Sequence, residues 1–182
     1  MDAKYEPLFT PWKVGNVEIK NRVVMLPMEG TNMIKWEAET GFSKGIKEFY
    51  EDRMDQNIGL FIPGLIPMVS IVGERWVYKH PEVFAPAKEV VDEIHECGAK
   101  VFFQLSAGAG RSMILPPLLK PLIKYKPVSD LTDKIVTSKW WWSAPDAGLP
   151  NVWSTDVKMY EFTSKMISQF VYAFGQTALR CK

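Results

Sequence analysis

Short apolar runs alternate with amphipathic stretches along much of the chain. Apolar runs without regular polar alternation cover residues 21–27, 59–66 and 100–105, which is typical of strands buried on both faces. Residues 43–55 and 86–97 lie between these runs, and their apolar positions recur at helical spacing. Strands that alternate with amphipathic helices predict a parallel sheet with helices on its face, so the predicted fold class is α/β.

Two further elements flank this core. Residues 11–20 predict a β-hairpin, because Gly15 and Asn16 form a turn signal between two short alternating runs. A last helix is predicted to begin after Thr163, whose hydroxyl group suits an N-cap. Its predicted inner stripe consists of Ile167, Phe170, Val171, Phe174, Ala178 and Cys181.

The stretch at about residues 112–158 predicts a short broken helix followed by a long irregular excursion, because it contains many prolines and a run of tryptophans at 140–142. A long irregular excursion in a compact domain is usually functional, and a lid over a binding site is the favoured interpretation. Clustered aromatic residues would also suit a membrane-surface or partner-binding patch.

Composition and charge exclude several classes of protein. Apolar residues make up 47% and charged residues 24% of the chain, and the net charge is +1, so no nucleic-acid partner is expected. No apolar stretch reaches the ~20 residues of a membrane-spanning helix, and the amino terminus lacks a signal-peptide pattern. A cytoplasmic location is therefore expected. Cys97 and Cys181 form neither a disulfide framework nor a metal site, and we interpret them as small buried residues.

Three parallel strands do not make a closed structure. A barrel of alternating strands and helices needs eight strands and typically about 250 residues. With three strands, both sheet edges keep unpaired backbone groups. The chain is therefore expected to be the first part of something larger.

Four segments carry longer motifs. They are PLFTPWKVGNVEIKNRVVMLPM at 7–28, FYEDRMDQNIGLFIPGL at 49–65, VVDEIHECGAKVFFQLSAGAGR at 90–111, and SAPDAGLP at 143–150 followed by the last helix. In order and spacing, these segments resemble the Old Yellow Enzyme and 2,4-dienoyl-CoA reductase family of NADH:flavin oxidoreductases. The resemblance implies the amino-terminal part of a (β/α)8 TIM barrel, an incomplete barrel with a β-hairpin that plugs its bottom. Residues 1–182 would form one partial FMN-binding domain.

The resemblance also implies an FMN site at the carboxyl ends of the strands. The expected contacts are Leu26, Pro27, Met28 and Glu29 after the first strand, Leu65 after the second, and Gln104 on the third. The Gln104 amide would hydrogen-bond the pyrimidine edge of the flavin. Leu65 departs from the small residue of the family. A substrate-side tyrosine is missing near Thr31, as is a histidine near Ala107, which suggests a divergent substrate pocket.

The activity implied is that of an FMN-dependent ene reductase. A hydride would pass from NADH or NADPH through the flavin to the activated C=C bond of a small-molecule or acyl-CoA-like substrate. The family's catalytic histidine pair would follow Lys182, and neither His80 nor His95 matches it, so no catalytic residue is assigned and this chain alone is expected to be inactive. A 4Fe-4S cluster or FAD would belong only to a further carboxyl-terminal part.

Two alternatives remain. The chain could be a catalytically inactive half-barrel or an interaction module, which self-associates or needs a complementing partner chain. A glycine-rich nucleotide loop at Gly108 and Gly110 is disfavoured, because Met113 stands where the third glycine would be and Pro116 and Pro117 interrupt the following helix.

Overall fold

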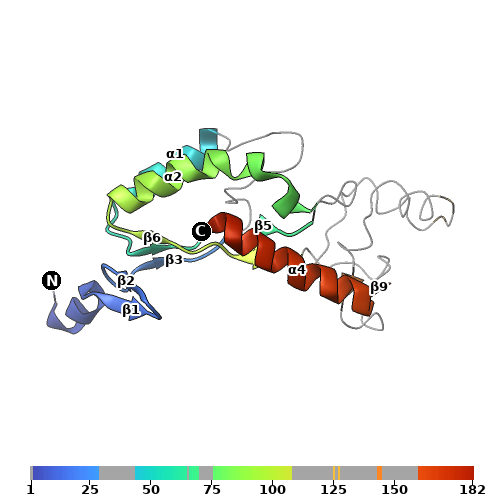
Figure 1. The fold of residues 1–182 in the computed structure, drawn as a ribbon. Coiled ribbons are helices and arrows are strands. Elements are labelled where there is room, and N and C mark those ends of the chain that lie inside the picture. The colour runs from blue at the N-terminus through green and yellow to red at the C-terminus, as the bar shows by residue number, and fades with distance from the viewer. Residues whose placement is uncertain are drawn as a thin grey trace. The chain divides into compact units, whose positions relative to one another are not determined.

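The computed structural model describes most of the chain outside its central excursion. The described residues are 2–28, 44–64, 66–69, 76–107, 125, 127, 143–144 and 160–182 (Figure 1). They belong to two compact units. The first unit comprises Met1–Ile66 with Pro81–Gln104, and the second comprises Pro67–His80 with Leu105–Lys182.

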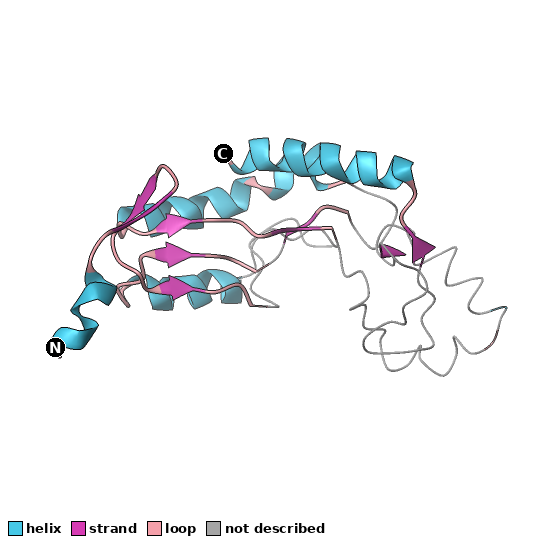
Figure 2. Cartoon of the chain, turned by 90° about the horizontal axis from the view of Figure 1, so that it is seen from below, coloured by secondary structure: helices cyan, strands magenta, loops and turns pink. Residues whose placement is uncertain are grey.

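A three-stranded parallel sheet forms the centre of the first unit. Its strands are β3 (Val24–Met25), β4 (Leu60–Phe61) and β6 (Lys100–Val101), in the spatial order β3-β4-β6. Figure 2 shows them side by side. Both pairings are parallel, with Val24 opposite Leu60 and Leu60 opposite Lys100. The predicted α/β class with a parallel sheet is therefore confirmed, and the strands are neighbours in the order in which they occur along the chain.

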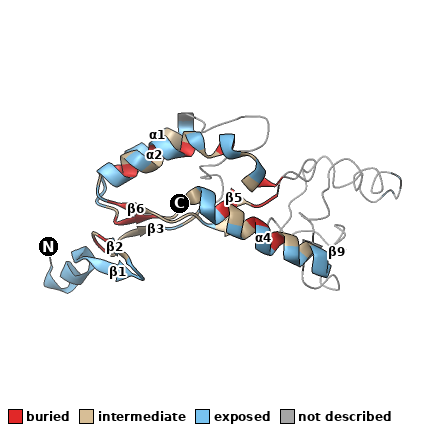
Figure 3. Cartoon of the chain, in the orientation of Figure 1, coloured by how far each residue is buried: buried red, intermediate tan, exposed pale blue. Residues whose placement is uncertain are grey.

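Two helices pack on one face of this sheet (Figure 1). They are α1 (Lys44–Met54) and α2 (Ala85–Glu96), which is preceded by the short 3-10 helix η3 (Pro81–Val83). Buried and exposed positions alternate along α2 (Figure 3), and its Val90 and Ile94 are almost fully buried, as its helical pattern predicted. Tyr50 of α1 packs against Phe61 of β4, with ring centroids 6.2 Å apart. These apolar contacts form the core of the unit.

The end of α2 is held by a backbone turn and a cation. Gly98 has a φ of 74°, a left-handed conformation that glycine adopts easily after a helix. The Lys20 ammonium group donates a hydrogen bond of 2.8 Å to the carbonyl oxygen of Cys97. A cation at this position also interacts favourably with the negative end of the helix dipole.

The amino-terminal segment consists of a 3-10 helix, η1 (Ala3–Phe9), and a hairpin. The hairpin pairs β1 (Trp12–Val14) with β2 (Val17–Ile19) in antiparallel fashion, and Gly15 has a φ of 60° in its turn, as predicted. Arg22 joins the two parts: its guanidinium group donates to the Pro7 carbonyl and the Thr10 hydroxyl, and it lies 4.5 Å from the centroid of the Trp12 ring. Since β2 leads directly into β3, the hairpin lies on the amino-terminal side of the sheet.

Asn21 is a buried polar residue that connects the start of β3 to the segment before β4. Its side chain is 2% exposed and donates to the carbonyl oxygen of Asn57 at 2.6 Å and to its side-chain oxygen at 3.2 Å. The Asn21 Oδ1 accepts a hydrogen bond from the Val23 amide at 3.0 Å. Gly59 lies so close that a Cβ atom there would stand 2.5 Å from the Asn21 carbonyl oxygen. Position 59 therefore requires a glycine, and position 21 requires an amide side chain.

The second unit is organised around the long helix α4 (Ser164–Cys181), which contacts the 3-10 helix η2 (Val77–Lys79). Thr163 is the N-cap of α4, as predicted, because its hydroxyl oxygen accepts a hydrogen bond from the Met166 amide at 3.2 Å. The short strands β8 (Ser143–Ala144) and β9 (Tyr160–Glu161) pair in parallel, and β5 (Ile66–Pro67) pairs with β7 (Leu105–Ser106). No helix in the described ranges is both long and apolar enough to span a membrane.

The predicted inner stripe of α4 is partly wrong. Phe170 is buried, but Ile167 and Val171 are 51% and 70% exposed. The buried face instead runs through Phe170, Ala173 and Thr177, which lie three and seven residues apart on one side of the helix. The small Ala173 and Thr177 side chains allow close approach of other segments. A pattern of large apolar residues does not include them, so it does not predict this face.

We predict that replacing Gly59 by alanine lowers the free energy of unfolding by about 1–3 kcal/mol, because the new methyl group overlaps fixed backbone atoms of Asn21. Gly45 is a matched control in α1, where an added Cβ meets nothing within 4 Å. There, alanine should be neutral or stabilise the helix by up to about 1 kcal/mol. Urea unfolding followed by circular dichroism measures both variants, and equal effects would contradict the proposed constraint.

Candidate functional site

The carboxyl ends of the three parallel strands meet at one edge of the sheet in the first unit. Leu26, Pro27 and Met28 follow β3, and Gln104 follows β6 after two phenylalanines. Because β3, β4 and β6 are parallel neighbours, these segments leave the sheet in the same direction. Ligands of barrels built from parallel strands bind at this edge.

Large apolar side chains are exposed at the end of β3. Met25, the last residue of the strand, is 8% exposed, whereas Leu26 is 66% and Met28 is 45% exposed. The side chains therefore change from the core to the surface directly at the strand end. These apolar side chains are therefore available at the strand end to contact a ligand. Pro27 restricts the backbone of this turn through its fixed φ angle.

Gln104 adds a polar group to the same edge. Its backbone carbonyl accepts a hydrogen bond of 2.7 Å from the Ile66 amide, which fixes the backbone at this position. Its side chain is exposed and carries both a donor and an acceptor. The residues at this edge thus fit a flavin in chemical character: apolar groups for the ring and an amide for a heterocycle edge that also carries donors and acceptors.

Four of the six predicted flavin contacts, Leu26, Pro27, Met28 and Gln104, lie in the described part of the first unit, at this edge. The other two, Glu29 and Leu65, lie outside the described residues. The role of all six in binding stays a prediction.

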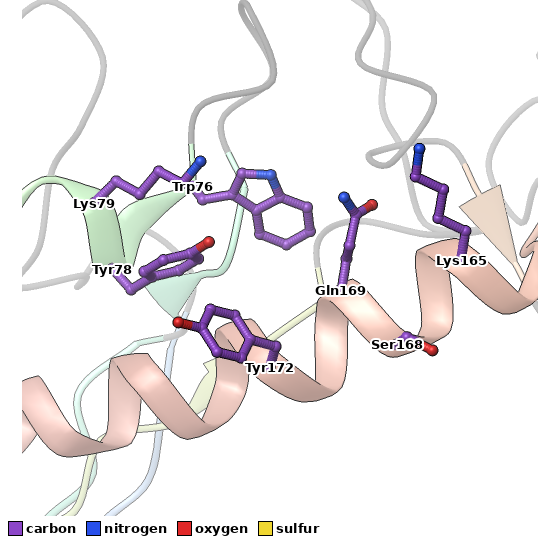
Figure 4. Close-up of a pocket in the computed structure, with 7 residues that line it drawn as sticks. All are labelled: Trp76, Tyr78, Lys79, Lys165, Ser168, Gln169 and Tyr172. Atoms are coloured by element: carbon purple, nitrogen blue, oxygen red, sulfur yellow. The ribbon is translucent and has the colours of Figure 1, made fainter.

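One hollow in the second unit was not predicted from the sequence. It lies between η2 and α4 (Figure 4) and is lined by Trp76, Tyr78, Lys79, Lys165, Ser168, Gln169 and Tyr172. Four of these residues recur three or four positions apart on α4, which places them on one face of the helix. This spacing of polar and aromatic side chains is the signal that could have indicated the hollow.

The cysteines and histidines do not gather into a metal site among the described residues. No group of three or more histidine, cysteine or acidic residues there could hold a metal ion. Cys97 and Cys181 are both free and half-buried, so neither is as fully buried as expected. Burial raises the pKa of the Cys181 thiol to about 11, which keeps it protonated at neutral pH and chemically unreactive.

Comparison with known proteins gives a consistent result. The model of the NADH:flavin oxidoreductase / NADH oxidase family matches residues 7–182. The chain is 28% identical over 185 residues to a cinnamate reductase of Clostridium sporogenes, an alignment that covers 98% of this chain and 24% of that protein.

Two solved structures are similar in fold. Old Yellow Enzyme from Pichia sp. AKU4542 matches with a TM-score of 0.62 and 24% identity, over 96% of this chain and 42% of that chain. Morphinone reductase in complex with tetrahydroNAD matches with a TM-score of 0.61 and 19% identity, over 96% and 46%. The chain therefore spans less than half the length of each of these relatives. The likeness confirms the fold class of an incomplete (β/α) barrel.

We predict that Cys181 reacts slowly with iodoacetamide at pH 8, because only its thiolate is a nucleophile and burial raises its pKa to about 11. The rate should rise about tenfold per pH unit from pH 8 to 10, as the thiolate fraction rises. Mass spectrometry of the labelled carboxyl-terminal peptide measures it. A rate that levels off below pH 9.5 would contradict the burial of this thiol.

Proposed function

The chain belongs to the NADH:flavin oxidoreductase / NADH oxidase family, and from this premise we propose that the protein is an FMN-dependent oxidoreductase of the ene-reductase type. When bound, FMN would accept a hydride from NADH or NADPH and deliver it to an activated C=C bond. The observation that carries the proposal is the pair of exposed apolar side chains after β3, Leu26 and Met28, together with the exposed Gln104 amide after β6, at the same edge of the sheet.

In this proposal the chain binds and orients the flavin. Leu26 and Met28 would contact the ring and exclude water from it, and their exposure supports this role. Pro27 would hold the turn between them in one conformation, so little conformational entropy is lost on binding. The Gln104 amide would hydrogen-bond the polar edge of the ring and so tune its potential. Glu29 and Leu65 are assigned to the same site by family resemblance.

The proposed substrate is a small molecule, or an acyl-CoA-like compound, with an activated C=C bond. The support comes from the similarity to a cinnamate reductase, whose name specifies an unsaturated acid as the compound reduced by that protein. We assign no catalytic proton donor to this chain. Its two histidines, His80 and His95, do not lie among the strand-end residues.

A second candidate function is that of a half-barrel that acts only with a partner chain or with a second copy of itself. It is favoured by an apolar hollow of about 380 Å³ in the second unit. The hollow is lined by Ala107, Phe162, Ile167, Phe170, Val171 and Phe174. Exposed apolar surface of this kind marks contact sites in many proteins.

We predict that the Gln104→Leu variant binds FMN about tenfold more weakly than the unaltered protein, because the polar edge of the ring loses its hydrogen-bond partner. Leu26→Asp should weaken binding further, since it places a charge against an apolar ring. Leu8→Asp is the matched control, because Leu8 is also exposed but lies on η1.

The measurement is a fluorescence titration of FMN with the protein produced from its complete gene, followed by anaerobic reduction with NADH or NADPH. Failure to bind FMN would sink the proposal. If Leu8→Asp weakened FMN binding as strongly as Leu26→Asp, the FMN site would not lie at the strand ends.

The second candidate is tested by Val171→Asp, with Leu179→Asp as control, because Leu179 is similarly exposed on α4 but does not line the apolar hollow. Docking at the hollow predicts that only Val171→Asp dissociates the assembly in analytical ultracentrifugation. A purified wild-type protein that sediments as a monomer at all concentrations contradicts self-association through this face.

A further inference from the structure

We draw no further inference here: the strongest candidate, the hollow of about 520 Å³ between η2 and α4, carries nothing, because the Lys79 and Lys165 ammonium groups lie at its opposite ends (Figure 4) and the rest of its exposed lining does not define one ligand.

Discussion

The buried side chain of Asn21 is the constraint on which the sheet of the first unit depends. It joins the start of β3 to the turn at Asn57, whose φ of 54° is left-handed, and it leaves no room for a side chain at Gly59. A buried amide that loses its partners is destabilising by about 1–3 kcal/mol. The Asn21 contacts therefore hold the entry of β3 beside the entry of β4, and the pairing of Val24 with Leu60 follows from that position.

The functional consequence appears at the opposite end of the same strands. A fixed register at the amino ends fixes which residues leave the sheet at the carboxyl ends. Met25 is thereby directed to the core while Leu26 and Met28 are directed to the surface. The Ile66 amide, bonded to the Gln104 carbonyl, fixes the third strand's end in a similar manner. The sheet thus carries apolar side chains after β3 and the Gln104 amide after β6 at the same edge, where we propose that FMN binds.

Local signals explain why most elements could be predicted from the sequence. Gly15, Gly98 and Thr163 each mark an element boundary through backbone conformation or capping, and the structure has the hairpin, α2 and α4 at those positions. The buried face of α4 could not be predicted, because it is set by packing around the small residues Ala173 and Thr177. The six residues proposed to bind flavin were predicted by family resemblance, since a single glutamine at a strand end indicates no ligand by itself. The spacing of Lys165, Ser168, Gln169 and Tyr172 on α4 predicts one side of the hollow between η2 and α4, but the η2 side depends on contacts between segments far apart in the sequence and could not be predicted.

The central claim is that FMN binds at the strand ends of the first unit. Hydrogen–deuterium exchange with and without FMN tests it most directly, because each peptide reports its own protection. If FMN binds there, exchange slows on FMN addition in peptides that cover residues 24–28 and 101–104, and exchange in α4 stays unchanged. Unchanged exchange at both strand ends, or protection confined to α4, would contradict it.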